Sequence, residues 1–245
     1  MEGNRFYDWV DEGDVPVLVI DGVIDTGTDW YSDAVTPRAF REALDAHAGQ
    51  DILVSINSPG GDVFAGFEIY NLLAQRSGGT TVRVMGLAGS AASYIAMAAD
   101  PGRLQMCRAS MMMIHLPWSG ASGNADRLRD QAAVLDEIGE IMTDIYMQRA
   151  TCSREALAAM LRAERYLSPT EALAYGLCDE IVDAAEADGE DAARDAMRGR
   201  CAAMTLTQVK DLRKHLVIRT PQTHEDAEDD TTDYLAMADA LIADL

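Results

Sequence analysis

The segment TVRVMGLAGSAASYIAMAAD (residues 81–100) decides the fold class of this chain. It begins with an apolar, β-branched run typical of a strand, TVRVMGL (81–87), and continues into a run of small and apolar residues typical of a helix, GSAASYIAMAA (89–99). The pattern changes at a glycine-containing junction around Ser90. A strand that passes directly into a helix is the building unit of α/β domains.

The alternation of strand-like and helix-like segments continues on both sides of this unit. Strands are predicted at residues 16–24, 52–57, 104–107 and 111–115, and helices at residues 37–49, 63–73, 153–161 and 168–177. Each of the last two helices opens with a serine that can cap the free amide groups of its first turn. Because parallel strands need crossover connections, the alternation indicates an α/β domain with a mainly parallel sheet.

The longest helical candidate covers residues 124–150. Its apolar side chains recur at spacings of three, four or seven residues and form one stripe: Leu128, Leu135, Ile138, Met142 and Ile145. From the pattern alone, a helix that packs on its own domain is the favoured interpretation. The length of the helix also suits a contact with a partner subunit, so both alternatives stay open at this point.

Charge and composition exclude several classes of protein. The formal net charge is −21, which argues against nucleic acid or an anionic membrane as the main partner. The four cysteines are widely spaced and form no CxxC pair, so a metal site of the Cys/His type is not expected. The first residues are acidic and contain no apolar stretch typical of a signal peptide, and no apolar run reaches membrane-spanning length. We therefore expect a cytoplasmic protein.

The sequence divides into three regions. Residues 1–14 form an N-terminal segment, residues 15–183 the α/β domain, and residues 184–245 an acidic C-terminal extension. Residues 183–245 hold 15 acidic and 7 basic side chains, with an acidic run at HEDAEDDTTD (224–233). This composition predicts a largely mobile extension with helical patches near 205–216 and 233–245, or else a small separate domain.

Elimination narrows the chemistry that the α/β domain can perform. The only lysines, Lys210 and Lys214, lie in the extension, which argues against a Schiff base, a phosphate-binding P-loop or a Ser–Lys dyad in the domain. Among the four histidines, only His115 ends a strand that looks buried. Taken alone, such a histidine is more often structural, but it is the favoured candidate for a general base.

Two strand-to-helix junctions could complete a site. The adjacent glycines of NSPGG (57–61) let the backbone turn sharply and expose N–H groups that can stabilise an oxyanion, although a plain turn explains them equally well. GLAGSAAS (86–93) places a serine among small residues at a helix N-terminus, where a serine is usually a cap. Ser90 stands at the turn itself and is the favoured nucleophile over Ser93, which would lie within the first helical turn.

These motifs carry a family resemblance. INSPGG (56–61), GLAGSAAS (86–93), MIHLPWSGASGNADRL (113–128) and ERYLSPTEALAYGLCDEI (164–181) resemble, in the same order, the proteolytic subunit of the Clp protease. The similarity extends over about residues 15–183. GDVFAGFEIYN, AASYIAMAAD and the tryptophan of HLPWSG look closest to the phage-encoded branch of the family, the head-maturation (prohead) proteases.

The resemblance implies a fold, an activity and a set of site residues. The fold is an α/β, ClpP/crotonase-like arrangement of repeated ββα units with a long projecting helix. The activity is that of a serine endopeptidase without metal or cofactor. The family's nucleophile and general base fall on Ser90 and His115, and its oxyanion-hole amides on Gly61 and Ala91. The third triad member falls on Glu164, where the family usually has Asp.

The resemblance also implies partners. Helix 124–150 would interleave with its counterpart in another subunit and so stack two rings. The resemblance therefore favours a helix that contacts a partner subunit over one that packs only on its own domain. The phage-like features predict capsid or scaffold proteins as substrates, and the extension would contact these proteins or be removed by the enzyme itself.

Four alternatives remain at this point. Asp179 is a less favoured third triad member. The chain could be a general degradative peptidase that works with an ATPase, a crotonase-type acyl-CoA enzyme, or an inactive assembly protein.

Overall fold

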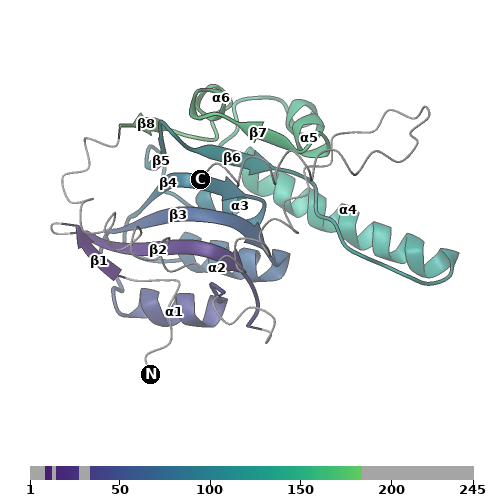
Figure 1. The fold of residues 1–245 in the computed structure, drawn as a ribbon, viewed down its shortest axis with the longest axis horizontal. Coiled ribbons are helices and arrows are strands. Elements are labelled where there is room, and N and C mark those ends of the chain that lie inside the picture. Colours follow the sequence, from purple (N-terminus) through teal and green to yellow (C-terminus); the bar gives the residue numbers. More distant parts are fainter. Residues whose placement is uncertain (1–8, 13–14, 28–33, 184–245) are drawn as a thin grey trace, which may run out of the picture. The chain divides into compact units, whose positions relative to one another are not determined.

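The computed structural model describes residues 9–12, 15–27 and 34–183 (Figure 1). The predictions for residues 184–245 lie outside this described part of the chain. Within it, strands and helices alternate along the sequence, and the elements share one hydrophobic core. The predicted α/β fold class is therefore confirmed.

One sheet contains all the strands of the described residues. They are β1 (Trp9–Glu12), β2 (Val15–Ile24), β3 (Ile52–Gly61), β4 (Thr80–Gly89), β5 (Leu104–Cys107), β6 (Met111–Ile114), β7 (Arg165–Leu167) and β8 (Glu180–Val182). The strand order is β1-β2-β3-β4-β5-β8, and β6 pairs with both β4 and β7. Every pair is parallel except β1 with β2 and β6 with β7. The predicted mainly parallel sheet is thus confirmed.

The long strand β4 pairs with two different strands along its length. Residues 82–84 pair with β5, whereas residues 87–89 pair with β6. The end of β4 and the end of β6 therefore lie side by side. Since Ser90 follows β4 and His115 follows β6, this fork brings together two residues that are 25 positions apart in the sequence.

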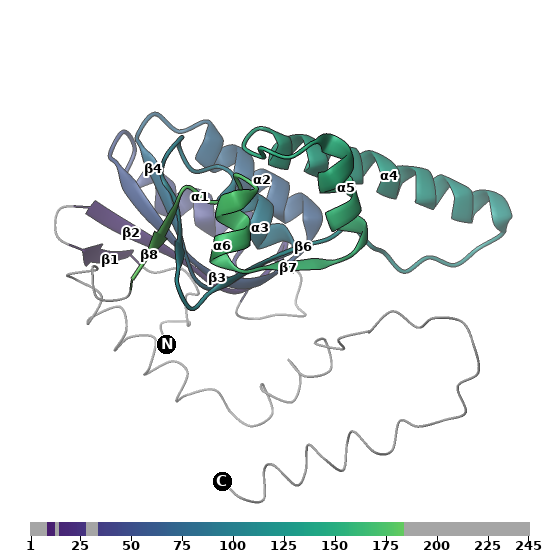
Figure 2. The same ribbon diagram turned by 90° about the horizontal axis from the view of Figure 1, so that it is seen from above.

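Six helices accompany the described strands. They are α1 (Pro37–Asp45), α2 (Val63–Ala74), α3 (Ala91–Ala96), α4 (Ala125–Met147), α5 (Arg154–Arg162) and α6 (Pro169–Ala174). Helices α1, α2 and α3 pack next to one another as a layer against the sheet (Figure 2). The predicted serine caps are confirmed, because Ser153 caps α5 and Ser168 forms a capping box with Glu171 at α6.

Helix α4 is the longest described helix, and its N-terminal part projects away from the sheet (Figures 1 and 2). Its buried residues all lie in the C-terminal half, between Ile138 and Tyr146. Among the described residues, no helix is both long enough and apolar enough to cross a membrane.

Candidate active site

Ser90 stands between β4 and α3 in a strained backbone conformation. Its φ is 50° and its ψ is −120°, which non-glycine residues rarely adopt. The Ser90 amide donates a hydrogen bond to the carbonyl of Met113 at 2.9 Å. Although Ser90 occupies the N-cap position of α3, its side chain makes no capping hydrogen bond. The hydroxyl therefore remains available for another contact, as in the sharp nucleophile turns of α/β hydrolases.

The imidazole of His115 provides that contact. Its Nε2 lies 2.7 Å from Ser90 Oγ, within the distance at which a general base takes a proton. His115 is only 8% exposed. Burial lowers the pKa of the imidazole below 6.5, and the negative charge of Glu164 partly offsets this by raising it. The ring is therefore neutral at neutral pH and can accept the Ser90 proton.

The glycine turn at the end of β3 packs directly against the serine. A Cβ on Gly60 would lie 2.8 Å from the Cβ of Ser90 and 2.7 Å from the amide nitrogen of Ala91. A Cβ on Gly61 would lie 1.9 Å from the carbonyl oxygen of Ile24. Only glycine fits at either position, so the backbone of the turn reaches the serine closely. Ala91 is the first residue of α3, where helix amides have no carbonyl partner inside the helix.

Glu164 lies beside His115 because of the pairing between β6 and β7. Ile114 pairs with Arg165 in this antiparallel ladder, so the next positions along it are His115 and Glu164. Glu164 is exposed and has a φ of 48°. Within the described residues, no hydrogen bond joins its carboxylate to the imidazole, and the influence on His115 is electrostatic.

The alternative acid, Asp179, is engaged elsewhere. Its carboxylate accepts a hydrogen bond from the amide of Leu104 at 2.8 Å and forms an ion pair with Arg149. The Arg149 guanidinium also donates to the carbonyl of Ala99 at 2.8 Å. Asp179 therefore ties the end of α4 to the start of β5, and the structure does not bring it to His115.

The alternative serine, Ser93, makes its side-chain hydrogen bonds with Ser90 and Tyr146 and not with His115. Its hydroxyl lies 2.6 Å from the carbonyl oxygen of Ser90 and 2.6 Å from the hydroxyl of Tyr146. Ser93 and Tyr146 are both fully buried. Tyr146 is not among the site residues predicted from the sequence, although it follows Met142 by four positions and so shares the buried face of α4.

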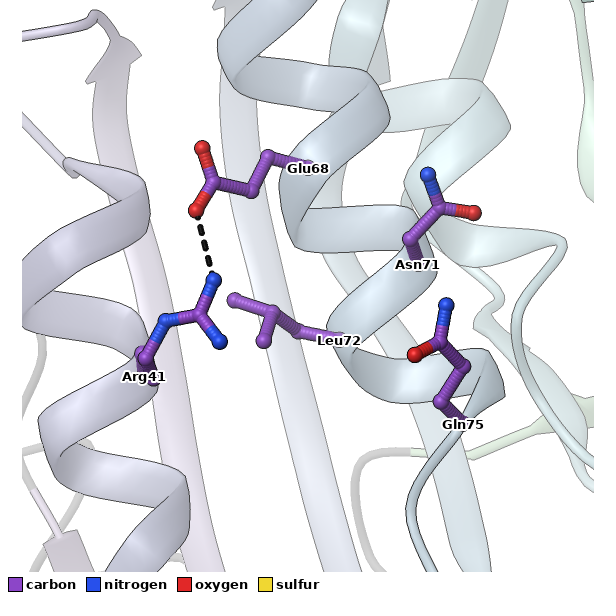
Figure 3. Close-up of a pocket in the computed structure, with 5 residues that line it drawn as sticks. All are labelled: Arg41, Glu68, Asn71, Leu72 and Gln75. Atoms are coloured by element: carbon purple, nitrogen blue, oxygen red, sulfur yellow. Dashed lines mark hydrogen bonds and ion pairs between the residues drawn. The ribbon is translucent and has the colours of Figure 1, made fainter.

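A surface hollow lies outside this group of residues. A polar hollow between α1 and α2 is lined by Arg41, Glu68, Asn71, Leu72 and Gln75, with an ion pair between Arg41 and Glu68 (Figure 3). It contains none of the residues discussed above.

In the part of the chain that the structure describes, no three His, Cys, Asp or Glu side chains gather where a metal ion could bind.

Comparisons with known proteins identify the family of this chain. The sequence model of the Clp protease family matches residues 39–185. The chain is 34% identical over 134 residues to the ATP-dependent Clp protease proteolytic subunit of Deinococcus radiodurans, a match that covers 55% of this chain and 66% of that protein. It is 31% identical over 169 residues to proteolytic subunit 1 of Chlamydia caviae, covering 65% of this chain and 88% of the relative. This chain therefore belongs to the Clp protease family of serine-type peptidases.

Proposed function

We propose that this chain hydrolyses peptide bonds through an acyl-enzyme formed on Ser90. His115 Nε2 takes the hydroxyl proton as Ser90 Oγ attacks the peptide carbonyl, and then delivers it to the leaving amine. Water, activated by the same imidazole, releases the acyl group and restores the serine. The observation that carries the proposal is the 2.7 Å contact between the two side chains at a strained turn.

The amides of Gly61 and Ala91 are the proposed donors to the oxyanion. Both lie at strand-to-helix junctions: Ala91 directly follows Ser90, and Gly61 directly follows Gly60, whose lack of a side chain lets the two junctions approach. Fixed backbone donors of this kind stabilise the tetrahedral intermediate without having to reorganise during the reaction. Family members carry out this chemistry without a metal ion or cofactor, and we propose the same for this chain.

Glu164 is the proposed third member of the triad. Its charge favours the imidazolium that forms during attack, which is the role of the acid in serine peptidases. The β6–β7 register puts Glu164 at the position beside His115, and a Glu carboxylate can accept the imidazole N–H as the Asp usual in the family does. In this proposal a carboxylate–imidazole hydrogen bond forms when substrate binds, since catalytic hydrogen bonds often tighten only in the complex.

A peptide-hydrolysis assay tests the catalytic proposal. We expect Ser90→Ala and His115→Ala to lower kcat/KM on unfolded casein by at least about a thousandfold. His47→Ala, which alters a half-buried histidine just after the end of α1, is the matched control and retains wild-type activity. Wild-type rates in either active-site variant would contradict the assignment.

We also propose that the projecting half of α4 mediates self-association. Leu128 and Val134 on this half are 43% and 49% exposed, and Trp118 in the loop before the helix is 81% exposed. The same loop lies against the helix, since a Cβ on Gly139 would contact the side chains of Leu116 and Pro117. A second copy of the chain would bury these apolar groups, as in stacked rings held together by this helix, and would reconcile assembly with a net charge of −21.

For the substrate, we propose capsid or scaffold proteins processed during phage head maturation. The support is the likeness of GDVFAGFEIYN, AASYIAMAAD and HLPWSG to the phage-encoded branch. Incubation with the capsid or scaffold protein encoded beside this chain should give a few discrete products that are absent with His115→Ala. Complete degradation of unrelated unfolded proteins, stimulated by an unfoldase ATPase, would instead support a general degradative peptidase.

A further inference from the structure

The buried pair Ser93 and Tyr146 has no part in the proton transfer described above. The two hydroxyls lie 2.6 Å apart, and neither residue is exposed to solvent. Tyr146 comes from α4 and Ser93 from α3, at a separation of 53 positions in the sequence. Two hydroxyls buried together at this distance are costly unless their hydrogen bonds are satisfied, so the direction of each bond can be worked out.

The carbonyl oxygen of Ser90 fixes that direction. It can only accept, so the 2.6 Å contact with Ser93 uses the single hydroxyl proton of Ser93. The hydroxyl of Tyr146 must then be the donor in its contact with Ser93. The result is a chain of hydrogen bonds from Tyr146 O–H to Ser93 O–H to the Ser90 carbonyl. Burial raises the pKa of Tyr146, so its phenol keeps the proton that it donates to Ser93.

This series of hydrogen bonds ends at Ser90, the residue whose backbone conformation is strained. Ser90 has a φ of 50°, a conformation that persists only where the surroundings fix it. On the N-terminal side its amide is held by Met113 at 2.9 Å. On the C-terminal side its carbonyl accepts both the amide of Ser93 at 2.9 Å and the hydroxyl of Ser93 at 2.6 Å. The Ser90 peptide is thus clamped at both ends.

We propose that Ser93 and Tyr146 are positioning residues that hold the Ser90 backbone in its strained conformation and so aim Oγ at His115. Neither side chain touches the reacting atoms. The proposal rests on the catalytic role of Ser90, and it adds the prediction that reactivity of the serine depends on a buried hydroxyl pair anchored in α4.

A double-variant experiment separates positioning from simple stability. Ser93→Ala leaves the Tyr146 hydroxyl buried without its acceptor, so it lowers the unfolding midpoint most. The double variant S93A/Y146F removes both hydroxyls together and should unfold close to the wild-type midpoint, because no polar group is left unpaired. If the pair positions Ser90, the double variant still reacts with a fluorophosphonate probe about tenfold more slowly than wild type, as a misplaced reacting group does.

Tyr146→Phe and Tyr94→Phe form the matched comparison in case the alanine variants fold poorly. Each removes one buried phenol hydroxyl, and the Tyr94 hydroxyl donates to the carbonyl of Val63 at 2.9 Å and not to Ser93 or Ser90. We expect Tyr146→Phe to slow labelling of Ser90 several-fold and Tyr94→Phe to leave the labelling rate unchanged, with similar small losses in unfolding midpoint.

Three results would overturn the inference. Labelling of S93A/Y146F within twofold of wild type would show that the pair does not position Ser90. Labelling rates that follow the unfolding midpoints across all four variants would show a structural role only. A folded wild-type protein that is not labelled at Ser90 would remove the proposed function and this inference together, whereas the first two results leave the proposed function standing.

Discussion

The C-terminal half of α4, from Ile138 to Tyr146, is buried in the domain, whereas most of its N-terminal half, residues 125–137, faces solvent. Both halves belong to the same predicted apolar stripe. Ile138, Met142 and Ile145 join the hydrophobic core, but Leu128 stays exposed. Helical periodicity therefore identifies which face of a helix is apolar, but it does not identify what covers that face.

The two halves also differ in what they can influence. The buried half contributes Tyr146, which reaches the Ser90 turn through Ser93. The projecting half carries the exposed side chains of Leu128 and Val134, which are those proposed to meet another subunit. Substitutions in the buried half should therefore change stability and serine reactivity, whereas substitutions in the projecting half should change assembly.

The largest expected effect comes from truncating a buried side chain. Met142 is 2% exposed, so Met142→Ala leaves a cavity and should lower the free energy of unfolding by about 2–5 kcal/mol. Leu128→Ala, the matched change in the projecting half, should alter it by no more than about 0.5 kcal/mol. Chemical denaturation of both variants measures the difference, and equal losses would show that the two halves of α4 contribute equally to stability.

A charge in the projecting half should act on assembly instead. Leu128→Glu would place a carboxylate in the proposed apolar contact between subunits and raise the dissociation constant of the assembly at least about tenfold. The midpoint of unfolding of the separated subunit should not change, because Leu128 lies outside the core. Sedimentation velocity measures the association. An unchanged assembly would mean that this half of α4 has a different partner.

The smallest expected effect is a shift in pH dependence. Activity requires neutral His115, so the rate should rise with pH through the pKa of the imidazole, which burial places below 6.5. Glu164 raises this pKa. Glu164→Gln should therefore shift the part of the pH–rate profile in which the rate increases to lower pH. Tyr146→Phe should lower the maximal rate without changing the pH at which the rate increases. Identical pH profiles for wild type and Glu164→Gln would contradict the proposed role of this acid.

Much of the fold could be predicted because its signals are local. The runs that form β2 to β6, the helices between them and the glycine turns can be recognised within about ten residues each. Strands β1, β7 and β8 were not predicted, since β1 contains only four residues and β7 and β8 only three, and each is defined by its partner strand. The end of α3 at Ala96, earlier than predicted, likewise depends on the turn that follows it.

The residues of the candidate site also differ in whether a local sequence pattern indicates them. Ser90, His115 and the glycine turn stand in recognisable local patterns, and the fork of β4 brings them together. Tyr146 has no local pattern that indicates its role, because its hydrogen-bond partner is 53 positions away and the helical stripe assigns it only to the core. Such contacts follow from tertiary packing and cannot be inferred from a single sequence.

The most direct test of the account is to locate the nucleophile. Wild-type protein treated with a fluorophosphonate probe should carry one adduct, and peptide mapping by mass spectrometry should place it on Ser90. The adduct should be absent from Ser90→Ala and strongly reduced in His115→Ala, with Ser93 unlabelled in every case. An adduct that persists on Ser93 in Ser90→Ala, or none at all on the folded wild-type protein, would contradict the account.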